Sequence, residues 1–306
     1  MATEKLTSFE ALSGEIAAAV EKAAASVVAI HARRHALSSG VLWREDVIVT
    51  AHHTVRRDDG IQVMLPDGSA AEAKLAGRDP STDLAVLQVA GASAQLPEMG
   101  QASSLKPGNL VLAVGRVESG PRASLGMVGV AAGSWRTWRG GEVERLLRVE
   151  IDLHPTLSGA ALVDGAGNVL GILTAGLSRT RAVAIPPATV NRVVTALLQK
   201  GHIARGYLGL GLYPVLVPSE RQEASAQPGN RGAVVVSVEP GGPASQAGIL
   251  VGDVVVTLDG KPVKDTSDVQ ELLGPGFVGK TIIASLVRGG KPFEFEIKVG
   301  ERPHQR

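Results

Sequence analysis

Short apolar segments separated by turn residues fill the sequence from about residue 26 to residue 185. They are rich in β-branched side chains and are bounded by Gly, Asp or Pro, as at Pro66-Asp-Gly68. The segments are residues 27–31, 47–50, 61–65, 84–89, 110–114, 126–130, 146–151, 161–163, 169–174 and 182–185. Many short strands at such spacing predict a mostly β fold, either a sandwich or a barrel.

Two helical patterns flank this region. Residues 12–25 carry apolar side chains at helical spacing, with charged residues on the other face. Residues 188–200 repeat that spacing and end at Gly201, which is a suitable C-cap. We therefore expect an N-terminal helical segment over residues 1–25 and a first domain over residues 26–200.

The rest of the chain has the pattern of a small second domain, expected over residues 205–302. A Gly-rich apolar strand comes first and is followed by a polar insertion at residues 219–231. Strands around residues 233–238 and 253–258 come next, and a helix begins near Thr266 or Ser267.

Composition excludes several classes of function. With 306 residues, of which 44% are hydrophobic and 20% charged, the chain is long enough for two cores. The 31 basic and 30 acidic residues nearly cancel, so no strong field attracts nucleic acid. The absence of cysteine excludes disulfides, thiol nucleophiles and cysteine zinc sites. We expect no metal, because the four-residue gap between His31 and His35 does not converge in a strand, and no other cofactor.

Nothing near the start of the sequence has the form of a leader. Glu4, Glu10 and Glu15 interrupt any apolar core of a signal peptide. No uncharged run reaches the roughly 18 apolar residues that cross a bilayer. The sequence as given predicts a cytoplasmic protein without a membrane span, or a periplasmic or extracellular one if a leader has been removed.

Three residues occur in contexts typical of acyl-transfer chemistry. His53 ends the apolar run 47–53, Asp83 lies in a turn before the run 84–89, and Ser158 precedes Gly159 and other small residues. A serine hydroxyl needs an imidazole to take its proton and a carboxylate to orient that imidazole. The order His, Asp, Ser is that of a chymotrypsin-like triad. Taken singly, Ser158 is typical of a turn hydroxyl, Asp83 of an acid in an N-terminal turn, and His53 of a hydrogen-bonded polar residue at a strand end.

Several longer motifs resemble the HtrA/DegP-like serine proteases. In the first domain they are residues 48–53, residues 77–87, and residues 155–163 with residues 169–174. In the second, residues 205–210, 238–249 and 251–263 look like one bacterial-type PDZ domain. The resemblance implies a chymotrypsin-like pair of β-barrels followed by a small α+β PDZ domain. It also aligns Thr50-x-x-His53, which favours His53 over His52 as the base.

The resemblance further implies an oxyanion hole formed by backbone amides of Thr156, Leu157 and Ser158. The family pattern is Gly-Asn-Ser-Gly-Gly, whereas this chain has Thr156-Leu-Ser-Gly-Ala160. A β-branched residue is disfavoured at positive φ, so the Thr156 amide is expected to point away from the developing charge. Loss of one such donor lowers turnover by about 100- to 1000-fold, which predicts a slow enzyme or one that needs activation.

Substrate contacts are also implied by the resemblance. Leu153, Leu173 and Ala175 would line the pocket for the side chain before the scissile bond, and their character predicts a modest aliphatic residue there. In the PDZ domain, the backbone of the loop Tyr207-Leu208-Gly209-Leu210 would bind a peptide carboxylate. Val269 and Leu272 of the following helix would favour an apolar terminal side chain.

These patterns predict a serine endopeptidase that acts on unfolded or exposed polypeptides, with a PDZ domain that binds peptide C-termini. The departures at Thr156 and Leu157 leave an alternative, a catalytically impaired protease fold that serves as a peptide-binding scaffold or chaperone. Relatives form trimers through their N-terminal segment, so the resemblance also implies a possible homo-oligomer, with Phe9 and the first helix as contacts.

Overall fold

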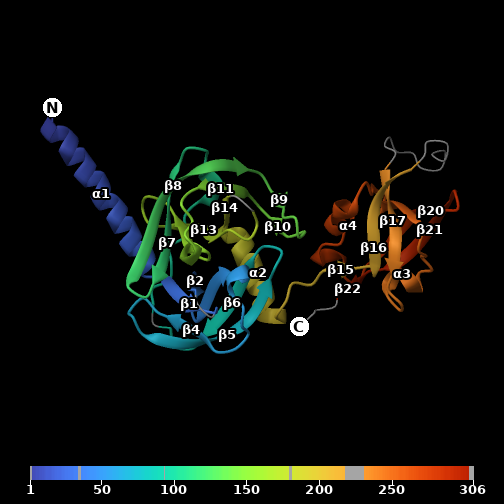
Figure 1. Cartoon of the computed structure of the whole chain (residues 1–306), viewed down its shortest axis with the longest axis horizontal. Coiled ribbons are helices and arrows are strands. Elements are labelled where there is room, and N and C mark those ends of the chain that lie inside the picture. The colour runs from blue at the N-terminus through green and yellow to red at the C-terminus, as the bar shows by residue number, and fades with distance from the viewer. Residues whose placement is uncertain (1, 34–35, 93, 179–180, 218–230, 303–306) are drawn as a thin grey trace. The chain divides into compact units, whose positions relative to one another are not determined.

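The computed structural model describes residues 2–33, 36–92, 94–178, 181–217 and 231–302. It divides into two compact units, Met1–Ile203 and Ala204–Arg306 (Figure 1). The first holds two closed β-barrels and the second a small sheet with short helices. The predicted fold, a chymotrypsin-like double barrel followed by a PDZ domain, is confirmed.

The first barrel has the strand order β1-β2-β3-β6-β5-β4 and closes by antiparallel pairing of β1 with β4. Its strands are β1 (Val27–His31), β2 (Ser38–Arg44), β3 (Val47–Ala51), β4 (Ile61–Met64), β5 (Ala70–Asp79) and β6 (Leu84–Val89). Alternate residues of β3 belong to different cores. Ile48 fills the barrel interior, whereas Val47 and Val49 face outward into a second core. Because both faces are buried, the strand is apolar at every position except Thr50 instead of alternating.

The second barrel has the order β11-β14-β13-β12-β7-β8. Its strands are β7 (Leu110–Val117), β8 (Gly120–Ala132), β11 (Leu146–Glu150), β12 (Ala161–Val163), β13 (Val169–Thr174) and β14 (Ala182–Ile185). A hairpin of β9 (Trp135–Arg136) and β10 (Glu142–Val143) lies between β8 and β11. Short 3-10 turns precede or follow strands at η1 (His52–Thr54), η2 (Ala102–Ser104) and η3 (Pro155–Leu157).

A shared core joins the two barrels. It contains outward-facing residues of both, such as Val49 and Leu84 from the first barrel and Val114 and Ile172 from the second. Helix α2 (Pro187–Lys200) adds Val190, Val193, Val194 and Leu197 to this core. It ends at Gly201, whose φ of 74° is the left-handed conformation expected of a glycine C-cap. The seam between the barrels is therefore well packed.

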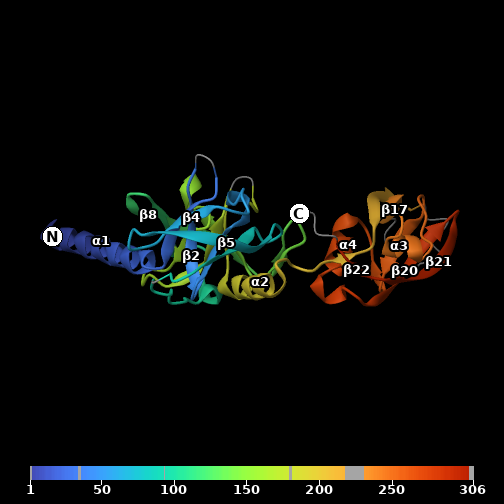
Figure 2. The same cartoon turned by 90° about the horizontal axis from the view of Figure 1, so that it is seen from below.

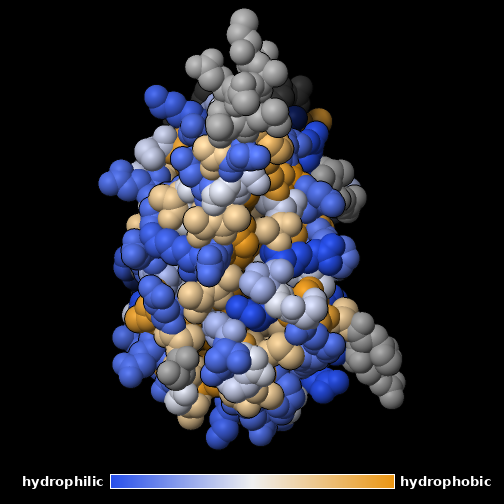
Figure 3. All heavy atoms as spheres, turned by 90° about the vertical axis from the view of Figure 1, so that its left-hand side faces the viewer, coloured by the Kyte–Doolittle hydropathy of each residue, from blue (hydrophilic) through white to orange (hydrophobic). Residues whose placement is uncertain are grey.

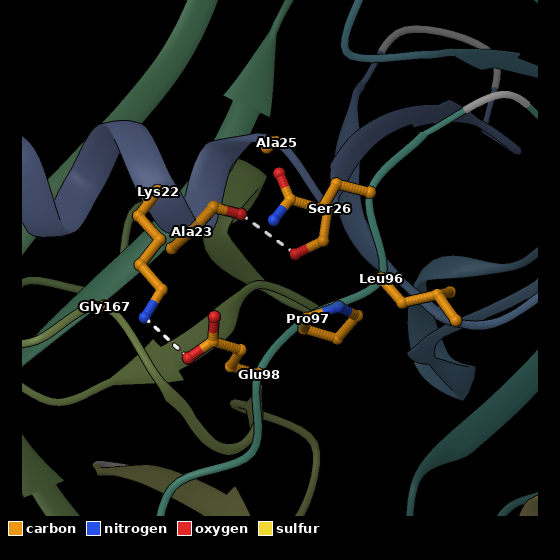
Figure 4. A pocket seen from close by; sticks show the side chains of 9 residues that line it. Lys22, Ala23, Ala25, Ser26, Leu96, Pro97, Glu98 and Gly167 are labelled. Carbon is orange, nitrogen blue, oxygen red and sulfur yellow. Dashed lines mark hydrogen bonds and ion pairs between the residues drawn. The ribbon is translucent and has the colours of Figure 1, made fainter.

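Helix α1 (Ala2–Ala24) begins before the predicted residues 12–25 and extends away from the barrels (Figures 1 and 2). Its C-terminal end is held by Lys22, whose Nζ donates to Glu98 Oε2 and Asn168 Oδ1, each at 2.9 Å. Lys22 and Glu98 border a small pocket beside Ser26 (Figure 4). Further out, Phe9 is 70% exposed and Leu12 49%. The role of this segment in a homo-oligomer stays a prediction.

Two strands of the first barrel, β2 and β5, were not among the predicted segments. β5 has the sequence Ala-Ala-Glu-Ala-Lys-Leu-Ala-Gly-Arg-Asp, in which residues of low β-propensity prevail. The prediction was too short for β8, given as residues 126–130 where the strand runs from Gly120 to Ala132. In each case pairing with neighbouring strands sets the conformation, because closing a barrel overrides weak local preference.

The second unit contains a five-strand path in the order β16-β17-β18-β20-β21. Its elements are β15 (Gly206–Tyr207), β16 (Leu210–Leu216), β17 (Arg231–Val238), α3 (Pro243–Gln246), β18 (Val254–Leu258), β19 (Lys261–Pro262), α4 (Thr266–Leu272), η5 (Pro275–Phe277), β20 (Thr281–Arg288), β21 (Lys291–Lys298) and β22 (Gly300–Glu301). Helix α4 begins at a capping box formed by Asp265 and Asp268. Nearly all of the predicted polar insertion at residues 219–231 lies outside the described residues.

No helix in the described part of the chain is long and apolar enough to cross a membrane. The face shown in Figure 3 presents hydrophobic residues among a majority of hydrophilic ones. Such a mixture is ordinary for a protein surface. The predicted compartment stays a prediction.

Candidate active site

His53 and Asp83 meet where two paired strands of the first barrel end. β3 pairs with β6 so that Ala51 lies opposite Leu84. The chain continues from Ala51 into the turn η1, which carries His53, while Asp83 immediately precedes β6. The His53 Nδ1 lies 2.7 Å from Asp83 Oδ2, and the His53 backbone N–H donates to Asp83 Oδ1 at 2.9 Å. Both oxygens of the carboxylate thus bind the same residue.

Asp83 is buried and has an unusual backbone conformation for a residue other than glycine. Its side chain is 4% exposed, whereas that of His53 is 32% exposed. Its φ of 56° lies in the left-handed region, which Asp tolerates better than most residues. An ionised carboxylate only accepts hydrogen bonds, so it holds the imidazole proton on Nδ1 and leaves Nε2 as an acceptor. This is the tautomer that a general base requires.

Thr174 and Gly176 complete this pair, and the sequence prediction missed both. The buried hydroxyl of Thr174 donates to Asp83 Oδ2, and the Gly176 N–H donates to Thr174 Oγ1 at 2.8 Å. A Cβ at residue 176 would lie 2.3 Å from Asp83 Oδ2 and 2.8 Å from His53 Nδ1. Only glycine fits there. The one available signal was a threonine at the end of an otherwise apolar strand.

Ser158 lies on the second barrel, and backbone hydrogen bonds join its segment to Ser39 of β2 and to Leu173 of β13. Its carbonyl accepts from the Ser39 N–H at 3.1 Å, and the next amide, of Gly159, donates to Leu173 O at 2.8 Å. Leu173 directly precedes Thr174, which binds Asp83. Ser158 is 3% exposed, and its hydroxyl makes no hydrogen bond to another described residue. The structure therefore brings the segment of Ser158 beside the His53–Asp83 pair, with the hydroxyl unengaged.

Gly159 explains how closely these segments approach. Its φ is 85°, and a Cβ there would lie 2.1 Å from Ser39 O and 2.4 Å from Thr50 Oγ1. Thr50 belongs to β3, three residues before His53. A side chain at residue 159 would therefore push the serine loop away from the strand that leads to the histidine.

The loop before Ser158 forms the 3-10 turn η3. The Thr156 N–H donates to His154 Nδ1 at 3.4 Å, and the Leu157 N–H donates to His154 O at 2.8 Å. Leu157 is 1% exposed and belongs to the core of the second barrel. Thr156 is not among the residues with positive φ. The amides predicted to form an oxyanion hole at residues 156 and 157 thus donate to His154 in this conformation.

His52, next to His53, is in a different environment. Its Nδ1 is buried without a hydrogen-bond partner. Burial lowers its pKa, with Asp83 opposing and Arg78 adding to that effect. No carboxylate binds the buried Nδ1 of His52 to fix its tautomer, whereas Asp83 does so for His53. His52 is therefore the less suitable base.

The predicted specificity residues lie in unlike surroundings. Leu173 is completely buried in the core of the second barrel, Leu153 packs at the margin of that core, and Ala175 is exposed. Their role stays a prediction.

His31 lies 3.8 Å from Glu118, from Nε2 to Oε1, and His35 falls outside the described residues. Within the described ranges, no three His, Cys, Asp or Glu side chains gather where a metal could bind.

The predicted peptide-binding residues of the second unit surround the start of β16. The Glu239 N–H donates to Gly209 O at 2.8 Å, and the Ala244 N–H donates to Leu208 O at 2.9 Å. Gly209 has a φ of 73°. β16 stands at the end of the strand order, and α4 lies against it. Leu208, Val269 and Leu272 are buried in the core, while Tyr207 and Leu210 are half-buried.

Family models match both units. The trypsin-like peptidase domain matches residues 38–172, and the PDZ domain matches residues 208–299. The serine protease Do-like HtrA of Lactobacillus helveticus is 31% identical over 279 residues, covering 85% of this chain and 68% of that protein. A probable periplasmic serine endoprotease of Brucella suis biovar 1, named DegP-like, is 31% identical over 286 residues, covering 90% of this chain. The chain spans 55% of that relative's length.

Solved structures agree with these matches. The HtrA-type protease AlgW, solved with a decapeptide, superposes with a TM-score of 0.74 and 27% identity, covering 95% of this chain and 99% of that one. The serine endoprotease from Yersinia pestis gives a TM-score of 0.73 and 27% identity, covering 94% and 98%. The similarity therefore extends over both units.

Proposed function

The chain belongs to the HtrA/DegP family of trypsin-like serine proteases, and from this premise we propose that it cleaves unfolded or exposed polypeptides with Ser158, His53 and Asp83. The observation that carries the proposal is the short contact of 2.7 Å between His53 Nδ1 and the buried carboxylate of Asp83. We assign residues 26–200 to the protease domain and residues 205–302 to the PDZ domain.

The proposed reaction proceeds through an acyl-enzyme. His53 Nε2 takes the proton of Ser158 as Oγ attacks the peptide carbonyl, and Asp83 stabilises the imidazolium that forms. The same imidazolium then gives its proton to the leaving amine. Water attacks the ester in the second half, with His53 again acting as the base. No metal or cofactor takes part in these steps.

A fluorophosphonate probe tests the proposal, because it reacts with serines activated by a base. We expect the probe to label the wild type at Ser158, located by peptide mass spectrometry, and not to label Ser158→Ala or His53→Ala. Ser103→Ala, a change at an exposed serine of the same unit, is the matched control and keeps the label. Casein hydrolysis must follow the same pattern. An unlabelled wild type that still binds peptides would instead identify a scaffold.

We further propose that the second unit binds peptide C-termini. The edge strand β16 offers backbone groups to an added strand, and the turn at Gly209 would present amides to a carboxylate. A peptide with an apolar final residue is expected to bind with its free carboxylate and to lose about 10- to 100-fold in affinity when amidated, since charge-assisted hydrogen bonds are lost. Fluorescence anisotropy with both forms of one peptide measures this. Equal affinity of the two forms would contradict carboxylate recognition.

A further inference from the structure

Two arginines of the first barrel are held close to the turn that carries His53. Arg33 directly follows Ala32, and Arg56 directly follows Val55. Ala32 and Val55 are both buried in the interior core of the barrel, so the backbone before each arginine is fixed. The Arg56 N–H donates to Ala32 O at 3.1 Å, which joins the chain after β1 to the chain after η1. Arg33 and Arg56 therefore lie on neighbouring segments.

Arg78 fixes the backbone on both sides of Arg56. Its Nη1 donates to Val55 O at 3.2 Å, and its Nη2 donates to Arg57 O at 3.4 Å. The same Nη2 donates to Asp58 Oδ1, so this nearby acid is already paired. The Arg56 side chain is exposed. Arg56 thus presents a free-reaching cation on a rigid backbone.

The guanidinium of Arg33 has donors without partners. Its Nε and Nη2 are buried, and neither makes a hydrogen bond in the structure. Burial lowers the pKa of Arg33, and the charge of Arg56 adds to that effect. Among the described residues no carboxylate forms an ion pair with either arginine, and the acid Glu118 lies beside His31 instead. Buried donors without partners cost stability, and an anion is the ligand that would offset this cost.

We propose that Arg33 and Arg56 form a subsite for a carboxylate in the part of the substrate that follows the scissile bond. The proposal rests on the proposed protease function and adds a sequence preference to it. His53 must reach the leaving nitrogen to give it a proton, so the substrate beyond that nitrogen passes the segment that follows His53. A planar guanidinium fork suits a carboxylate. Two sources supply one, namely an Asp or Glu side chain and the C-terminus of a short leaving segment.

The first test compares quenched fluorescent peptides that carry Glu or Gln at the first, second or third residue after the cleaved bond. All are amidated, which removes the terminal carboxylate. At one position we expect kcat/KM to be about tenfold higher for Glu, mainly through KM, because charge-assisted hydrogen bonds form. The ratio is expected to fall as salt is raised. A Gln peptide that ends at this position, compared as free acid and amide, tests the C-terminus as the source. Equal rates in every comparison overturn the proposal.

Substitutions then locate the preference. Arg33→Gln and Arg56→Gln remove the charge and keep a polar side chain, and each is expected to lower kcat/KM for the Glu peptide about tenfold, to the level of the Gln peptide. A damaged fold would instead lower both rates together. Arg148→Gln, at an exposed position of β11 in the second barrel, removes the same charge elsewhere and is expected to keep the preference. A preference that persists in both subsite variants contradicts the assignment.

Binding without cleavage provides a separate measurement. Fluorescence anisotropy on Ser158→Ala with the amidated peptides is expected to give a Kd about tenfold lower for Glu than for Gln. The difference is expected to vanish when Arg33→Gln is added. Equal Kd values for the two peptides overturn the subsite. If the wild type cleaves none of the peptides, the proposed function fails, and the Kd values alone then decide whether the two arginines bind a carboxylate.

Discussion

Replacing His53 by Ala is expected to lower kcat by about 10⁶-fold, because removing the base of such a triad costs nearly as much as removing the whole unit. His52→Ala is the matched change one residue earlier and is expected to leave kcat near the wild-type value. Only His53 contacts Asp83 through its ring, while the Nδ1 of His52 is buried without a partner. Initial rates on a fluorogenic peptide, corrected for active enzyme, measure both variants.

The pair of histidine variants also guards against a misassigned base. Urea unfolding of each protein shows whether the substitution has merely destabilised the first barrel. If His52→Ala were folded but inactive while His53→Ala kept full activity, the base would be His52, and our assignment of His53 would be wrong. Residual activity of His53→Ala is expected to be insensitive to further substitution of Asp83, since the carboxylate acts through the imidazole.

Sequence patterns predicted the strands that form continuous apolar runs and missed strands whose sequences contain many small or polar residues. β1, β6, β12, β13 and β14 were predicted with their observed bounds, because continuous apolar runs identify strands buried on both sides. β2 and β5 contain Ser, Gly, Ala and Lys, and their strand conformation comes from neighbours distant in the chain. Such neighbours are not visible in a local window.

In the candidate site, too, local motifs were predictable from the sequence and contacts between distant residues were not. The contact between His53 and Asp83 agrees with the predicted roles of these residues, which came from motifs of the chain. Thr174 and Gly176 could not be predicted, because their importance arises from contacts with Asp83, which is far away in sequence. The sequence showed that Thr156 replaces the glycine of the family pattern, but it did not show that Thr156 binds His154 and Ser39. That contact depends on how η3 packs against β2.

Replacing Asp83 by Asn is expected to lower kcat by about 10⁴-fold with the fold intact, because an amide reverses the tautomer of His53. The buried Oδ1 accepts the His53 backbone N–H, so the amide oxygen must stay at that position. Its NH₂ group then faces His53 Nδ1, which becomes an acceptor. The imidazole proton moves to Nε2, where the base must be free to accept from Ser158.

Asp79→Asn is the control for this change, because Asp79 is buried in the same turn but binds Ser81 and Thr82 instead of the histidine. Its substitution weakens those hydrogen bonds and is expected to lower the free energy of unfolding by about 1–3 kcal/mol with kcat maintained. ¹⁵N NMR of labelled histidine reports the protonated nitrogen of His53 in each variant. Two results would contradict this prediction: a proton that stays on Nδ1 of His53 in Asp83→Asn, or a loss of activity only in proportion to the loss of stability. In either case the carboxylate would be a structural group of the turn, and the proposed hydrolase would lack an oriented base.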